Sequence, residues 1–202
     1  MNKASKPKHV AIITNSLHRG GTETHLSQVL PALKARGWDL SVYLVSGNGE
    51  LIAQLEQAGI KVKRPSVFFL PLTFMQLLFY LATSKPDIVQ FMLPKAYLLG
   101  GISCVLLKKK KLIMCRRSLN NYQQKHRFLA KIEHWLHTKM SFITANNKQT
   151  YGELTTKEDV PAAKLKLIYN GIDLQRFNVL KKFTQPNIRR QDRKSTRLNS
   201  SH

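Results

Sequence analysis

The chain has 202 residues, and its 33 Lys and Arg against 11 Asp and Glu give a formal net charge of +22. A hydrophobic share of 43% is too high for a disordered basic tail, and the length suits one domain with a buried core. Two cysteines, Cys104 and Cys115, cannot form a secreted disulfide framework, and the polar start at residues 1–8 lacks the features of a secretory signal, so we expect a cytoplasmic protein.

Short apolar runs alternate with helical patterns along the chain. His9–Ile13 predicts a buried strand, and a turn-rich loop then leads to a helix that ends at Gly37, with Thr22 as its N-cap and a kink at Pro31. We expect further strands at 40–46, 60–63, 87–93, 112–115, 142–145 and 165–169. We expect further helices at 50–58, 70–83, 96–107, 123–140 and 147–154. This alternation predicts a doubly wound, mainly parallel, Rossmann-like α/β domain that binds ligands at the carboxyl ends of its strands.

Two helical segments raise the question of a membrane. The apolar stretch Val67–Ala82 is shorter than the ~20 residues of a spanning helix, so we expect a buried or membrane-facing helix. In helix 123–140 we expect four residues on one apolar side with basic residues beside them, which suits either an anionic bilayer surface or the core. The four are Phe128, Ile132, Trp135 and Leu136.

The first strand–helix loop carries adjacent glycines, Gly20 and Gly21, followed by Thr22. Glycines allow close backbone approach, and a helix N-terminus presents free N–H groups and a positive dipole, so a diphosphate would fit there. The spacing matches neither the dinucleotide fingerprint nor the P-loop. A plain tight turn is the alternative interpretation.

Further polar residues follow a strand at 112–115. Arg116 and Arg117 could clamp a phosphate or a carboxylated sugar as a pair, and Asn120 could bind sugar hydroxyls. Solvated surface charge is the alternative for the arginines, and turn chemistry for Asn120. His134 and His137 do not have the spacing of a zinc-binding helix, so we expect no metal site, and we expect both cysteines to be inert core residues.

Several motifs together resemble glycosyltransferase family 4. His18–Leu26 (HRGGTETHL) resembles the opening motif of the family, and Lys85–Val89 (KPDIV) resembles its fourth-strand signature. Leu93–Gly100 (LPKAYLLG) follows as in several bacterial members. Ile168–Asp173 (IYNGID) with Arg176-Phe177 resembles the segment that joins the first domain of these enzymes to the second. The resemblance covers residues 9–177 in order and spacing.

The resemblance implies a GT-B enzyme that transfers a sugar from a nucleotide-sugar with retention of configuration and without a metal or other cofactor. It implies that Gly20 and Gly21 line the cleft at the donor diphosphate, that Asn170, Gly171 and Asp173 lie at the interdomain cleft, and that the acceptor is a lipid-linked or cell-envelope glycan. Acceptor-side candidates are Gln90, Lys95, Arg116, Arg117 and Asn120. The usual His-x-His is replaced by Gln90 and Met92, so no catalytic residue can be named.

The resemblance also suggests the domain limits. We expect the family's N-terminal domain at 1–177 and a linker with a non-native basic tail at 178–202, the donor half being absent and the fragment inactive. The charge allows two alternatives, a non-catalytic basic module at a membrane surface and a nucleic-acid-binding α/β domain. We rank the second below the first because no nucleic-acid-reading motif is present. The preferred hypothesis is a cytoplasmic enzyme, peripheral at the inner face of the membrane, that does not bind nucleic acid.

Overall fold

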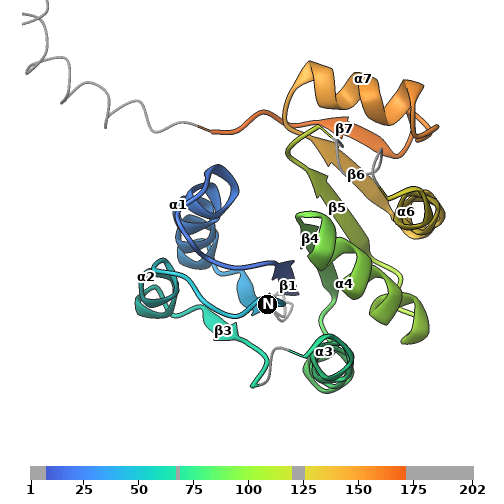
Figure 1. The fold of residues 1–202 in the computed structure, drawn as a ribbon. Coiled ribbons are helices and arrows are strands. Elements are labelled where there is room, and N and C mark those ends of the chain that lie inside the picture. The colour runs from blue at the N-terminus through green and yellow to red at the C-terminus, as the bar shows by residue number, and fades with distance from the viewer. Residues whose placement is uncertain (1–7, 67–68, 120–125, 172–202) are drawn as a thin grey trace, which may run out of the picture. The chain divides into compact units, whose positions relative to one another are not determined.

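The computed structural model describes residues 8–66, 69–119 and 126–171. Its centre is a seven-stranded sheet in the order β3-β2-β1-β4-β5-β6-β7, and every neighbouring pair of these strands is parallel (Figure 1). The predicted doubly wound α/β architecture is therefore confirmed. The order reverses between β1 and β4, which is where such sheets open a crevice at their carboxyl edge.

The observed elements agree with the predicted ones to within a few residues. The strands are β1 (His9–Thr14), β2 (Asp39–Leu44), β3 (Lys61–Lys63), β4 (Ile88–Met92), β5 (Leu112–Arg116), β6 (Phe142–Ala145) and β7 (Leu165–Leu167). The helices are α1 (Gly21–Ala35), α2 (Ile52–Gln57), α3 (Leu70–Ser84), α4 (Pro94–Leu106), α6 (Arg127–Lys139) and α7 (Lys148–Thr156). Among the described helices, none has the length and apolar character needed to cross a bilayer.

Two apolar clusters fill the two sides of the sheet. One gathers residues of β1, β2, α1 and α2, including Leu26 and Leu55. The other gathers residues of α3, α4, α6 and the strands they cover, including Leu77, Tyr97 and Leu136. Successive residues of a strand point to opposite faces, so β5 sends Leu112 and Met114 into the second cluster while Cys115 packs against the first.

One local prediction was wrong, and another was confirmed only in part. Helix α1 starts at Gly21 with Gly20 as N-cap, and the first turn has no side-chain cap, because Thr22 already lies inside the helix and is buried. In α6 the inward residues are Glu133, Leu136 and His137, whereas Phe128 and Trp135 are exposed. The sequence left a bilayer surface and the core open for the four apolar residues. Leu136 lies in the core and Ile132 packs against it, whereas Phe128 and Trp135 are exposed, so the four do not share one environment. Helix α1 continues through Pro31.

Candidate functional site

The candidate site lies at the carboxyl edge of the sheet, where the loop after β1 reaches the N-terminus of α1. The loop after β2 holds it in place, since the amide of Leu17 donates to the carbonyl of Asn48 at 3.0 Å and the amide of Leu51 donates to the carbonyl of Leu17 at 3.1 Å. A Cβ on Gly49 would lie 2.0 Å from the carbonyl carbon of Leu17. Sequence reasoning missed Gly49, although its Gly-Asn-Gly surroundings signal a tight loop.

The glycines open the start of α1 to solvent. Gly20 and Gly21 are both exposed, and a Cβ on Gly21 would meet nothing within 4 Å. On Gly20 a Cβ would lie 2.5 Å from a carboxylate oxygen of Glu23, a side chain that can move. Since the first turn carries no side-chain cap, its N–H groups and the positive end of the helix dipole are available to an anion.

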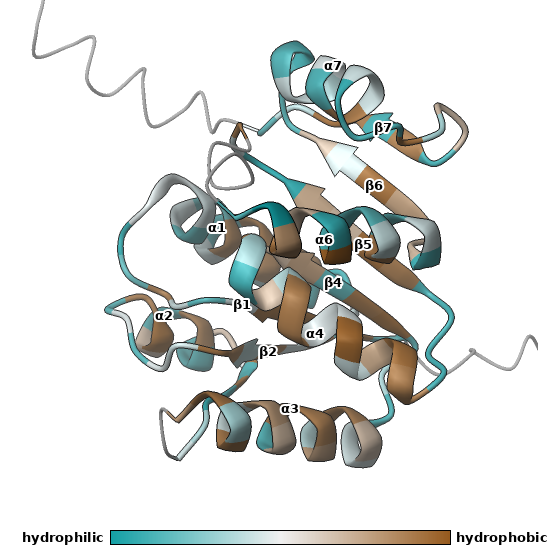
Figure 2. Cartoon of the chain, turned by 45° about the vertical axis from the view of Figure 1, so that its right-hand side comes forward, coloured by the Kyte–Doolittle hydropathy of each residue, from teal (hydrophilic) through white to brown (hydrophobic). Residues whose placement is uncertain are grey.

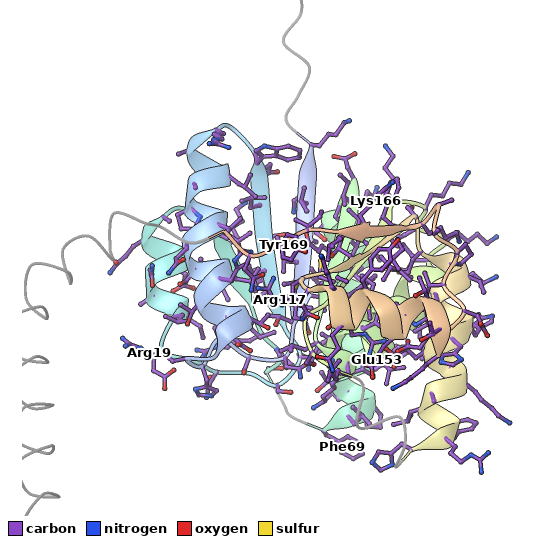
Figure 3. All side chains as sticks on the ribbon, turned by 90° about the horizontal axis from the view of Figure 1, so that it is seen from above. Arg19, Phe69, Arg117, Glu153, Lys166 and Tyr169 are labelled. Carbon is purple, nitrogen blue, oxygen red and sulfur yellow. The ribbon has the colours of Figure 1, made fainter. Side chains whose placement is uncertain are left out.

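The adjacent arginines at the end of β5 point to opposite faces of the sheet. Arg117 is half-buried on the α1 side, and burial lowers its pKa while the neighbouring Cys115 and Glu23 oppose that shift. Burial, with a smaller contribution from Arg117, lowers the pKa of His25 below its ordinary 6.5. Arg117 thus interacts electrostatically with His25 and Glu23 of α1, and Figure 3 shows it next to that helix.

Arg116 is instead buried on the α4–α6 side, so it is not the solvated surface charge that we considered. Its Nη2 donates to Glu133 Oε1 at 2.6 Å and to Glu158 Oε2 at 2.7 Å. His137 Nε2 lies 2.8 Å from the same oxygen of Glu158, and Tyr97 Oη lies 2.8 Å from His137 Nδ1. A clamp made of both arginines does not form in this structure, because the two-residue period of the strand separates them.

This buried network also holds the three potential metal ligands found among the described residues. Ligand atoms of Glu133, His137 and Glu158 lie within 4.8 Å of one another. The guanidinium of Arg116 already bonds to both carboxylates, so it supplies the positive charge that a metal ion would otherwise bring. The donor set therefore suits a structural ion-pair network better than a cation site.

Of the remaining predicted site residues, Gln90 lies on β4 and Lys95 on α4. Gln90 Nε2 donates to Cys115 Sγ at 3.0 Å, and burial raises the pKa of that thiol. Lys95, exposed at the start of α4, donates to Ser46 Oγ at 3.1 Å. Asn170 and Gly171 are exposed. Asn120 and Asp173 lie outside the described residues.

Asn15 is a further residue of this edge that sequence reasoning missed. Its Oδ1 accepts from the amide of Ala96 at 3.0 Å and so ties the end of β1 to the first turn of α4. An asparagine directly after a strand was the available signal.

A small pocket beside Cys115, Arg117 and Ser118 has about 10 Å³ of space, which is near the minimum for one water molecule.

Comparison with known proteins identifies the family of the chain. The model of Glycosyltransferase Family 4 matches residues 19–176. No curated protein shows significant sequence similarity to the chain.

Solved structures match at the level of the fold. The UDP complex of HepE from Anabaena superposes with a TM-score of 0.67 at 20% identity, over 83% of this chain and 45% of that one. The lipopolysaccharide outer core galactosyltransferase WaaB superposes with a TM-score of 0.60 at 15% identity, over 82% of this chain and 46% of that one. The UDP-GlcNAc 2-epimerase of Methanocaldococcus jannaschii superposes with a TM-score of 0.54 at 13% identity, over 80% of this chain and 45% of that one. The chain spans less than half the length of these three structures. A transferase and an epimerase share this fold, so the fold alone does not define the reaction.

Proposed function

The chain belongs to Glycosyltransferase Family 4, and we propose that it forms the acceptor-side domain of a GT-B hexosyltransferase that uses a nucleotide-sugar donor. The observation that carries this proposal is the exposed N-terminus of α1, which has no side-chain cap and lies at the carboxyl edge of the sheet beside the switch point, with the half-buried Arg117 next to that helix. Two phosphates of a nucleotide-sugar would find backbone N–H donors and a guanidinium there. HepE, which shares the fold, has been crystallised with UDP and with UDP-glucose.

The chemical contribution of this edge would be electrostatic. When the bond between the sugar and the diphosphate breaks, negative charge develops on the leaving nucleotide, and fixed positive groups stabilise that charge. The helix dipole amounts to roughly half an elementary charge and Arg117 adds a full one. In our proposal these groups serve where other transferases employ a metal ion, so the reaction needs neither a metal nor an organic cofactor, and the sugar is transferred with retention.

The acceptor would lie against the β4–α4 side of the same edge. Since Arg116 is engaged in the core and our proposal assigns Arg117 to the donor phosphates, Gln90 and Lys95 are the remaining described acceptor candidates. WaaB, a lipopolysaccharide outer core galactosyltransferase that shares the fold, supports a lipid-linked or cell-envelope glycan as the acceptor class. We place the enzyme in the cytoplasm, at the inner face of the membrane, without a role in nucleic-acid binding.

Binding of UDP tests the anion site directly. Phosphorus-31 NMR titration of UDP with the 202-residue chain should shift both phosphate resonances, and Arg117→Gln should weaken binding about tenfold or more, since a hydrogen bond to a charged group contributes about 1.5–3 kcal/mol. Arg127→Gln, an exposed arginine on α6, is the matched control. Uridine, which has no diphosphate, should not distinguish Arg117→Gln from the parent. Equal UDP affinity of Arg117→Gln and the parent chain would contradict the assignment.

A second measurement concerns catalysis. The structures that share the fold are about twice as long, so we expect the 202-residue chain alone to transfer little or no sugar from a panel of UDP-hexoses. Product formation by the purified chain would refute that expectation.

A further inference from the structure

A groove runs between β3, the outermost strand on its side of the sheet, and helix α3. Two cavities of about 350 and 540 Å³ form this β3–α3 groove, and they adjoin because Lys63, Tyr80 and Thr83 line both. Sites for small molecules have volumes of roughly 300–1,000 Å³, so each cavity is large enough for one. Gly21 and Arg117 line neither cavity, so the groove is separate from the proposed diphosphate site.

The floor of the β3–α3 groove carries hydroxyl groups. Ser41 Oγ lies 2.7 Å from His9 Nε2 and 2.7 Å from Tyr80 Oη, so the three side chains form a hydrogen-bonded chain. The ring of Tyr80 packs against that of Tyr43 with 4.9 Å between the ring centroids. Tyr43 lines the larger cavity and is 3% exposed, and its Oη has no hydrogen-bond partner among the described residues. Buried polar groups are nearly always paired, so this hydroxyl beside a cavity points to a ligand that bonds to it.

The wall that β3 contributes is basic. Lys63 and Arg64 are exposed and line the larger cavity, and Arg64 Nη1 donates to Asn48 Oδ1 at 2.8 Å. In the smaller cavity Lys61 and Asp39 offset each other's charge. No acidic residue lines the larger cavity in the described part of the chain. The larger cavity therefore favours a ligand with a carboxylate or a phosphate, the groups that arginine and lysine bind best.

The wall that α3 contributes is largely apolar. Phe79 and Met75 line the larger cavity and are 70% and 57% exposed. Figure 2 shows that α3 is hydrophobic on much of its visible surface. Gln76 lines the same cavity, and its Oε1 accepts from the amide of Ser66 at 2.9 Å, so its NH₂ group is the part that can donate to a ligand. This wall suits a ring with an apolar face and hydroxyl groups at its rim.

We propose that the β3–α3 groove binds an anionic sugar, a hexose ring that carries a carboxylate or a phosphate. The negative group bonds to Lys63 and Arg64. A ring hydroxyl pairs with Tyr43 Oη, and the C–H face of the ring packs on Phe79. Each of the three chemical features of the groove, its cations, its unpaired hydroxyl and its exposed aromatic ring, then has a matching group on one ligand.

Two properties of the floor favour a compact ligand of this kind. Burial, with a smaller contribution from Tyr80, raises the pKa of Tyr43 to about 12, so its hydroxyl keeps a proton to donate. Met75 has a flexible side chain that can turn to let a ligand reach this hydroxyl. Single-stranded nucleic acid also binds to basic and aromatic residues, but its backbone would follow the exposed rim and leave the buried hydroxyl unpaired.

Calorimetric titration of the full 202-residue chain with glucuronate and with glucose 6-phosphate tests the proposal and distinguishes the two anionic groups. At least one of these sugars should bind, and glucose and inorganic phosphate should each bind at least tenfold more weakly. Tyr43→Phe should weaken binding about fivefold, and Lys63→Gln at least tenfold, as expected for a neutral and a charged hydrogen bond. The Tyr43 hydroxyl bonds to no described residue, so Tyr43→Phe should not lower the melting temperature.

Matched controls remove similar side chains elsewhere. Phe79→Ala should weaken sugar binding, whereas Phe128→Ala on α6 and Lys148→Gln on α7, both at exposed positions, should bind like the parent chain. The proposal is overturned if neither anionic sugar binds, if glucose binds equally well, or if Tyr43→Phe keeps the parent's affinity. Tighter binding of a single-stranded oligonucleotide than of either sugar would also overturn it. Arg117→Gln should bind the sugar normally and Tyr43→Phe should bind UDP normally, so this inference and the proposed function fail separately.

Discussion

Replacing Arg116 by methionine tests whether the buried ion-pair network holds β5, α6 and the segment before β7 together. Arg116 is 5% exposed, and its partners Glu133 and Glu158 are 0% and 6% exposed, so solvent cannot compensate the two carboxylates once the guanidinium is removed. Breaking a buried pair by removing one partner costs about 3–5 kcal/mol. For a domain of this size that corresponds to a fall in melting temperature on the order of 10 °C.

The measurement is urea unfolding followed by circular dichroism, with Lys157→Met as the control. Lys157 Nζ forms a salt bridge of 2.7 Å with Glu153, close to the 2.6 Å of the Arg116–Glu133 bridge, but the lysine is 64% exposed. An exposed pair of this kind contributes about 0.3–0.5 kcal/mol. If the two variants lose similar free energies of unfolding, or Arg116→Met loses less than about 1 kcal/mol, the reasoning is refuted. Adding Glu133→Leu and Glu158→Leu to Arg116→Met should restore part of the stability, because no unpaired charge then stays buried.

Three further predictions concern the glycines Gly49 and Gly21, the histidine His25 and the cysteine Cys104. Gly49→Ala should destabilise the chain by more than about 1 kcal/mol, because its Cβ would lie 2.0 Å from a backbone carbon. Gly21→Ala has open space around its Cβ and should be neutral or stabilising by up to about 1 kcal/mol. Thermal unfolding compares the stabilities of the two variants. The lowered pKa of His25 means that the unfolded chain binds the extra proton, so the free energy of unfolding should fall as the pH drops through about 6.5, and His25→Gln should reduce that slope in urea titrations at several pH values. An unchanged slope in His25→Gln would contradict the assigned pKa shift. Burial raises the pKa of Cys104 to about 12, so a disulfide reagent at pH 8 should label it only after unfolding, and rapid labelling of the native chain would refute its burial.

Most of the fold could be predicted because the strands of a parallel sheet are buried on both faces. Such strands are short continuous apolar runs, and segments like Ile12–Ile13 or Val89 with Phe91 stand out from their polar surroundings. The ends of helices were harder to predict from the sequence. Thr22 satisfies the rule for an N-cap, yet the extended backbone of Gly20 takes that position and the threonine turns into the core.

The face of α6 could not be predicted because two of its three buried residues, Glu133 and His137, are polar. A helical pattern identifies sides from apolar residues, and it grouped the exposed Phe128 and Trp135 with the buried Leu136. The partners that allow Glu133 and His137 to be buried are Arg116, 17 residues away from Glu133, and Glu158, 21 residues away from His137. No local pattern contains those distant partners, so the tertiary network decided which side faces inward.

The two adjacent arginines show how the same local motif can serve the core and the site. The strand alternation sends Arg116 into the α4–α6 side, where two carboxylates neutralise it, and Arg117 toward α1, where burial lowers its pKa and Glu23 is close. The buried network fixes the end of β5, and the next residue in the chain is Arg117. A change at Arg116 should therefore weaken UDP binding through the position of Arg117 even though Arg116 lies on the other face of the sheet. If Arg116→Met binds UDP as tightly as the parent chain while it remains folded, the position of Arg117 does not depend on the network, and the two arginines act independently.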